Sequence, residues 1–244
     1  MFPIRDHNPS GRTPYVTWAL IAVNVAVFLL TWARLGTDWD TAVLFQKWGL
    51  LALDVTRRGQ YGGVLTSMFL HAGWLHLLGN MLFLWIFGDN LEGVFGPLGF
   101  LAFYLLGGAG AAALHVAMDP VSMIPMVGAS GAIAAVMGGY LLLFPRAQVD
   151  VLVILVIFVR IIAMPAWIVL CLWFVIQILG GLAAPVELGG VAYWAHAGGF
   201  LSGLALALPV WLRGGGPAYW SRSGGAPPSP AYAPSRIPLI RRRR

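Results

Sequence analysis

The sequence contains little charge and almost no cysteine. Only 10% of its 244 residues are Asp, Glu, Lys or Arg, 59% are hydrophobic, and the mean hydropathy is +0.80. A chain of this composition has too few polar residues to cover a water-soluble surface, which excludes an ordinary soluble domain. The single cysteine, Cys171, has no partner within the chain, so intrachain disulfides are excluded.

Acidic residues are missing from the positions where two kinds of intramembrane chemistry need them. All the aspartates fall in predicted loops or at the ends of apolar runs, which excludes an aspartyl protease with two membrane-embedded carboxylates. No HExxH pair is present and the histidines lack neighbouring carboxylates, so we expect no metal ion and no other cofactor. The sequence has no internal repeat of the kind that many transporters show.

The net charge of +6 does not come from a basic folded surface. Most of it lies at the chain ends, above all in Arg241, Arg242, Arg243 and Arg244. No basic face with interleaved aromatic residues is visible, which argues against nucleic-acid binding. The charge is instead typical of membrane topology and of attraction to anionic lipid.

Long apolar runs predict an all-α polytopic membrane bundle of six transmembrane helices. The expected spans are residues 14–33, 70–88, 97–118, 126–144, 165–183 and 193–212. Residues 149–163 are also apolar but contain Arg160, and we expect them to lie at the membrane surface. A single crossing between the fourth and last spans then places Ser130 and His196 at the same depth.

The positive charges favour an arrangement with both chain ends in the cytoplasm. Ten Lys and Arg residues then lie inside and four outside, with Arg160 left out as interfacial. The expected parts are a cytoplasmic segment (1–13) without the layout of a cleaved signal peptide, a membrane domain (14–212) and a disordered basic tail (213–244). The loop 34–69 is too long to be structureless and is expected to lie partly in the interface.

Ser130 and His196 are candidates for nucleophilic catalysis. Ser130 would attack a carbonyl, and His196 would take its proton as general base and return it as general acid. Small residues on the same faces, Ala134 with Ser130 and Gly203 with His196, favour the close helix approach that such a pair needs. Because no acid completes a triad, the imidazole must be oriented by packing or by a neutral group.

An oxyanion formed at this site has three candidate donors. They are the backbone N–H of Ser130, the side-chain amide of Asn80, and His76, which is four residues before Asn80 on the same helix face. His71 is rotated about 140° from His76 on a helix and is expected to order the loop or the helix start. Taken singly, a serine among small residues is also typical of packing, and His76 with Asn80 of an interhelical hydrogen bond.

Four segments together resemble the rhomboid intramembrane serine proteases, specifically the compact six-span bacterial form. They are TSMFLHAGWLHLLGNM (66–81), GDNLEGVFG (88–96), GASGAIAAVMGGY (128–140) and AHAGGFLSG (195–203). The family's GxSG motif corresponds to Gly128, Ser130 and Gly131, its AHxxG motif to His196 and Gly199, and its HxxxN motif to His76 and Asn80.

The resemblance implies an endopeptidase that cleaves transmembrane segments of membrane proteins near the outer membrane boundary, in a bacterial inner membrane. Its partners would be membrane-protein substrates and lipid. One rival function is an inactive protein of the same fold that binds transmembrane helices, and another is a small channel or transporter. We also expect residues 184–192 and the fifth span to gate the site, with Gly180, Gly181, Gly189 and Gly190 as hinges.

Overall fold

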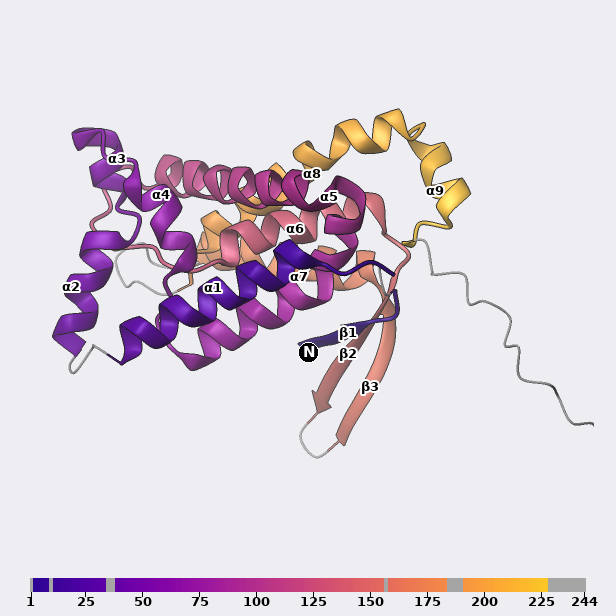
Figure 1. Cartoon of the computed structure of the whole chain (residues 1–244), viewed down its shortest axis with the longest axis horizontal. Helices are drawn as coiled ribbons and strands as arrows, with labels where there is room; N and C mark the ends of the chain where they lie inside the picture. Colours follow the sequence, from indigo (N-terminus) through magenta and orange to yellow (C-terminus); the bar gives the residue numbers. More distant parts are fainter. Residues whose placement is uncertain (1, 9–10, 34–37, 156–157, 184–190, 228–244) are drawn as a thin grey trace, which may run out of the picture.

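In the computed structural model most of the chain is helical, and the long helices lie side by side in one bundle (Figure 1). The structure describes residues 2–8, 11–33, 38–155, 158–183 and 191–227. The helices are α1 (Tyr15–Trp32), α2 (Asp38–Trp48), α3 (Ala52–Arg58), α4 (Gly62–Thr66), the 3-10 helix η1 (Ser67–Phe69), α5 (Trp74–Met118), α6 (Ser130–Leu143), α7 (Ala166–Ala183), α8 (Tyr193–Arg213) and α9 (Pro217–Ser223). The strands are β1 (Phe2–Asp6), β2 (Gln148–Leu155) and β3 (Phe158–Pro165).

Within the described residues, four helices are long and apolar enough to cross a membrane, namely α1, α5, α7 and α8. The helix α5 is interrupted at Gly96, whose φ of 70° and ψ of 168° are not helical. A positive φ favours glycine, and Pro97 is well suited to begin the next helix. The break falls between the expected second and third spans, while a count of six crossings stays a prediction.

The short helix α6 occupies the centre of the bundle between α5 and α8. Of its 14 residues, 11 are buried. At 1.5 Å per residue it is about 21 Å long, less than the ~30 Å hydrocarbon layer. This helix is shorter than the hydrocarbon layer, and its crossing of the membrane stays a prediction.

Small residues let α6 and α8 approach closely, as the sequence predicted. A Cβ on Gly199 would collide with the carbonyl oxygen of Gly131, and one on Gly203 with that of Ala135. The same hypothetical Cβ on Gly199 lies 3.2 Å from the side chain of Ala134. Larger side chains at Gly199 or Gly203 would therefore force the two helices apart.

The all-α prediction is wrong for one part of the chain. Of the run 149–163, expected at the membrane surface, residues 149–155 lie in β2 and residues 158–163 in β3, which pair antiparallel, and β1 adds a third strand beside β2. In Figure 1 this sheet projects from the side of the helical bundle. The run is rich in β-branched residues, and its alternate residues Val149, Val151 and Val153 are buried, which is strand periodicity.

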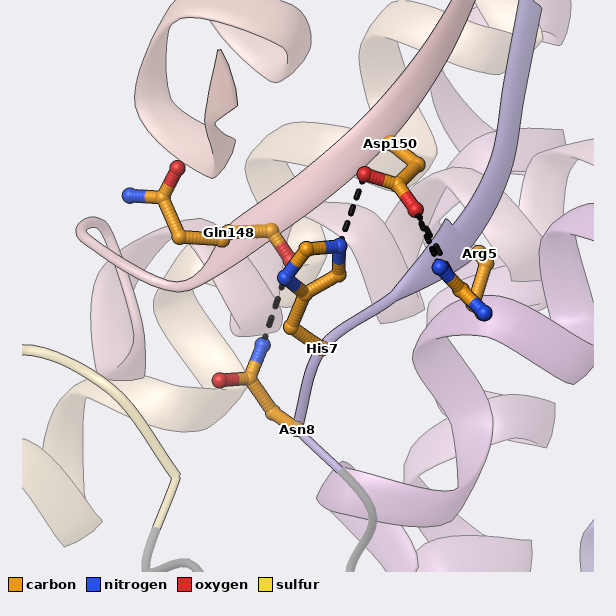
Figure 2. A network of polar contacts seen from close by, with 5 residues as sticks. All are labelled: Arg5, His7, Asn8, Gln148 and Asp150. Atoms are coloured by element: carbon orange, nitrogen blue, oxygen red, sulfur yellow. Dashed lines mark hydrogen bonds and ion pairs between the residues drawn. The ribbon is translucent and has the colours of Figure 1, made fainter. Parts of the chain in front are cut away.

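Polar contacts hold the N-terminal strand against β2 (Figure 2). Arg5 donates to Asp150 Oδ2 at 2.8 Å, and His7 Nε2 lies 2.7 Å from Asp150 Oδ1. The side chain of Asn8 donates to the carbonyl of Gln148 at 3.4 Å. Burial alone would raise the pKa of Asp150, but the hydrogen bonds from Arg5 and His7 outweigh it and lower that pKa.

Both chain ends differ from the simple tails that the sequence suggested. The segment 1–13 contains β1, because its residues complete a sheet edge that β2 would otherwise expose. The predicted disorder of 213–244 is wrong at α9, where Trp220 packs on Trp211 with ring centroids 5.1 Å apart and donates to the Leu142 carbonyl at 2.8 Å. Residues 228–244, with the arginine run, lie outside the described residues.

The long connection between α1 and α5 has structure of its own, as expected. It contains α2, α3, α4 and η1. Leu50 exchanges backbone hydrogen bonds of 2.9 Å with Met126, just before α6. This contact ties the connection to the end of the bundle where α6 begins.

Candidate active site

Ser130 is the first residue of α6 and follows a sharply turned backbone. Gly128 has a φ of 125°, and its N–H donates to the carbonyl of Ser67 at 2.9 Å. The first amides of a helix have no acceptor within the helix, so the N–H of Ser130 belongs to a set of donors available to a ligand. The glycine thus sets the angle at which Ser130 enters α6.

His76 lies beside the same turn, in the first turn of α5. A Cβ on Gly128 would lie 2.6 Å from Nε2 of His76 and 3.5 Å from Oγ of Ser130, so both atoms border one small volume. The N–H of Ala72 donates to Nδ1 of His76 at 3.4 Å. Because Nδ1 accepts, a neutral His76 carries its proton on Nε2, the atom that faces Gly128.

Asn80 follows one turn after His76 on α5. Its side chain is buried, and its amide nitrogen has no hydrogen-bond partner among the residues that the structure describes. His71 precedes the helix, and its ring lies edge-on to that of His76 with centroids 5.1 Å apart. Neither ring nitrogen of His71 has a hydrogen-bond partner among the described residues, so its role in ordering the helix start stays a prediction.

His196 lies in the first turn of α8, the helix that packs most closely on α6. Gly199 of α8 contacts Gly131 of α6. Gly131 follows Ser130 directly, and Gly199 lies about one helical turn after His196. The glycine pair therefore fixes the spacing of the two helix starts. The structure thus collects Ser130, Gly128 and His76 around one turn and sets the helix of His196 against it.

Gln177 on α7 is a neighbour of His196 that the sequence did not identify. Its Oε1 lies 2.7 Å from Nδ1 of His196, and its Nε2 donates to the carbonyl of Trp173 at 3.3 Å. Because the amide nitrogen is used on Trp173, the oxygen faces the imidazole and accepts the Nδ1 proton. Nε2 of His196 is thereby left as the basic nitrogen.

Packing from α7 holds the same imidazole. The ring of Trp173 lies 5.6 Å from that of His196, measured between centroids, and 6.1 Å from that of Phe200. Phe174 stacks on Phe200 at 4.6 Å. The group that contacts Nδ1 of His196 is therefore a neutral amide, and aromatic rings pack around it. The feature of the sequence that could have identified it is a single Gln in an otherwise apolar span.

The described residues hold no group of three or more His, Cys, Asp or Glu side chains placed to bind a metal ion. The chemistry available at the site is therefore that of a hydroxyl, imidazoles and amides. Such a set suits acyl transfer, in which a nucleophile, a proton carrier and an oxyanion donor act together.

The structure is an apolar helical bundle in which a serine and a histidine lie at adjoining helix starts, the arrangement expected of an intramembrane serine hydrolase. The family model of the Rhomboid domain matches residues 58–213, more than half of the chain. The chain belongs to the rhomboid family and is an integral membrane protein.

Individual relatives support the same conclusion. The chain is 31% identical to Rhomboid protein 1, mitochondrial, of Saccharomyces cerevisiae over 195 residues, which is 78% of this chain and 51% of the relative. It is 33% identical to Rhomboid protease GluP of Bacillus subtilis over 129 residues, 52% of this chain and 24% of the relative. The chain thus spans at most about half the length of these relatives.

Proposed function

We propose that the protein is an intramembrane serine endopeptidase in which Ser130 is the nucleophile and His196 the general base and acid. The observation that carries this proposal is the hydrogen bond of 2.7 Å between His196 and Gln177. It leaves Nε2 of the imidazole to accept the Ser130 proton, which is the protonation state that acyl transfer requires.

In the first step Oγ of Ser130 attacks a peptide carbonyl, and its proton passes to Nε2 of His196. The resulting oxyanion accepts hydrogen bonds from the N–H of Ser130, from the buried amide of Asn80 and from Nε2–H of His76. Preorganised donors of this kind contribute about 3–4 kcal/mol each to transition-state stabilisation. His196 then protonates the leaving amine.

In the second step water hydrolyses the acyl-enzyme, with His196 again as the base. The substrates that we propose are transmembrane segments of membrane proteins, cleaved near the outer membrane boundary. A helix hides its own carbonyls in backbone hydrogen bonds, so such a segment must unwind locally before attack. The short α6 supports this location, because its start need not reach the membrane surface.

The orientation that we propose has six spans, both ends of the chain in the cytoplasm, and a bacterial inner membrane as the location. Relatives named as mitochondrial and chloroplastic show that the family occupies other membranes too. The charge distribution supports the orientation, and the break of α5 at Gly96 supports a turn between the second and third spans.

Gating by the segment between α7 and α8 stays a prediction. The ring of Tyr193 packs against Gly180 and that of Trp194 against Gly181. A Cβ added to Gly180 would lie 2.5 Å from the Tyr193 ring, and one added to Gly181 would lie 3.0 Å from the Trp194 ring. Close packing thus gives these glycines a role besides any hinge motion. Gly189 and Gly190 lie outside the described residues.

The deciding experiment compares wild type, Ser130→Ala and His196→Ala on a single-span substrate in liposomes, together with labelling by a serine-directed phosphonate. We expect each variant to lose about 10⁴-fold in cleavage rate, and Ser130→Ala to lose labelling. Ser221→Ala, at an exposed serine of α9, is the matched control. Continued cleavage by Ser130→Ala contradicts the proposal, and binding of substrate without cleavage by wild type favours the inactive helix-binding alternative.

A further inference from the structure

A cavity with charged residues in its lining lies toward the opposite end of α6 from Ser130. Its volume is about 600 Å³. Asp6 on its wall accepts a hydrogen bond of 3.1 Å from Tyr140. Tyr140 is ten residues from Ser130 along α6, about 15 Å at 1.5 Å per residue. The cavity is therefore separate from the candidate active site.

The wall of this cavity carries charges of both signs. Its lining residues include the basic Arg5 and Arg12 and the acidic Asp6 and Asp89. Figure 2 shows that Arg5 also reaches from β1 to Asp150, which balances part of its charge. A wall of balanced charge suits a ligand that itself carries a negative and a positive group better than it suits a simple anion.

The two carboxylates form the negative part of the wall. Asp6 is held in place by Asn90, which donates to it at 2.8 Å, and by the Tyr140 hydroxyl. Burial and the nearby charge of Asp89 raise the pKa of Asp6 to about 6. Asp89 Oδ1 accepts from the backbone N–H and the side-chain amide of Asn90 at 2.7 Å and 3.0 Å. A cation bound between the two carboxylates relieves their repulsion, and a primary ammonium adds three N–H donors to those that the carboxylates already have.

Two tryptophans indicate the membrane depth of the cavity. Trp18 on α1 and Trp85 on α5 line it and are 45% and 58% exposed. Trp85 precedes Asp89 by about one helical turn. Exposed tryptophans of membrane proteins collect at the level of the lipid headgroups. The charged wall thus lies where apolar helix surface gives way to polar groups.

We propose that this cavity binds the headgroup of a phospholipid that carries a phosphate and a primary ammonium. The phosphate lies at Arg5 and Arg12. Because Nε and Nη2 of Arg5 donate to Asp150, Nη1 of Arg5 is the nitrogen that donates to a phosphate oxygen. The ammonium lies between Asp6 and Asp89, and the indoles contact the first carbons of the acyl chains. A choline headgroup has no N–H to donate, and a glycerol headgroup has no positive charge, so both bind less well.

Native mass spectrometry of the purified full chain in detergent tests this site. The protein is equilibrated with equal amounts of phosphatidylethanolamine, phosphatidylcholine and phosphatidylglycerol of the same acyl chains. We expect about tenfold preferential retention of phosphatidylethanolamine, a difference of about 1.4 kcal/mol. Asp89→Asn should abolish this preference, and Arg12→Gln should weaken all three lipids because each contains the phosphate.

Asp54→Asn is the matched control, because Asp54 pairs with Arg58 on α3 away from the cavity. Equal retention of the three lipids by wild type, or an unchanged preference in Asp89→Asn, overturns the proposal. If Asp89→Asn does not fold, the test uses Arg12→Gln, because Arg12 is exposed. Unchanged lipid retention by Arg12→Gln overturns the proposal. Displacement of the lipid by equal concentrations of phosphoethanolamine or inorganic phosphate would show a soluble ligand or a plain anion site instead, and would also overturn it.

Discussion

The hydrogen bond between Gln177 and His196 gives the site an orienting group without charge. We expect Gln177→Leu to lower kcat by about 10- to 100-fold with little change in KM, because an unheld imidazole seldom presents Nε2 to Ser130. Gln177→Glu, which keeps an acceptor for Nδ1–H, should restore part of the rate. Cleavage of the single-span substrate measures both.

Gln60→Leu, at an exposed glutamine outside the site, is the control for this series. A purely structural role for Gln177 predicts equal losses in the Leu and Glu variants, together with reduced thermal stability. Rescue by Glu at unchanged stability separates orientation from folding. Equal rates for wild type and Gln177→Leu would remove Gln177 from the mechanism.

Gly128 illustrates how strictly the turn before α6 is determined. Gly128→Ala places a methyl group 2.6 Å from Nε2 of His76 on a backbone with a φ of 125°. We expect at least a tenfold loss of cleavage, since even a small misplacement of Ser130 is costly. Gly79→Ala is the control, because nothing lies within 4 Å of a Cβ at that residue.

Similar activity of Gly128→Ala and Gly79→Ala would contradict the role assigned to this turn. At this scale the sequence was enough to predict Ser130, His196, His76 and Asn80 as site residues, because their motifs are local. It did not identify Gln177 as the partner of His196, because that contact joins two helices and depends on their packing rather than on spacing along the chain.

At the scale of elements, a carboxylate of α5 caps the start of α1. Buried Glu92 accepts hydrogen bonds of 2.9 Å and 2.8 Å from the N–H groups of Val16 and Thr17, and one of 2.8 Å from the Thr17 hydroxyl. The residue before the helix, Pro14, makes no side-chain cap of its own. The negative charge also complements the positive end of the helix dipole.

We expect Glu92→Ala to reduce the free energy of unfolding by about 3 kcal/mol, because three buried donors lose their acceptor. Glu92→Gln keeps one acceptor oxygen and should cost less. Thermal unfolding in detergent measures the change. Asp54→Ala, which removes a partly exposed i,i+4 ion pair on α3, should cost less than about 1 kcal/mol, and an equal loss in both variants would contradict the capping role.

The bounds of α7 were predictable from hydropathy, and the sheet was not. The expected span 165–183 differs from α7 by one residue at its start. A continuous apolar run of bilayer length rarely forms anything but a membrane-spanning helix. The run 149–163 is equally apolar, but its β-branched residues pair with β1, more than 140 residues earlier in the chain. Hydropathy alone contains no information about such a distant partner.

At the scale of the whole molecule, the sheet and the start of α6 define two opposite ends. In a Cys171→Ser background, Met123→Cys should react with a membrane-impermeant maleimide from outside. Gln148 begins β2, and Thr13 lies between Arg12 and Pro14, which line one cavity with Arg5 of β1. Thr13→Cys and Gln148→Cys should therefore react only after permeabilisation. Labelling of Gln148→Cys and Met123→Cys from the same side would contradict the crossing of α6.

The pairing of β1 with β2 also sets an order for biosynthesis. At 5–20 residues per second the ribosome adds β2 roughly 7 to 30 s after β1, and α1, α5 and α6 emerge in between. The first strand therefore waits without a partner until the central helix has been made. The sheet can therefore form only after α1, α5 and α6 have been synthesised, so pairing of the N-terminal strand is a late step of assembly.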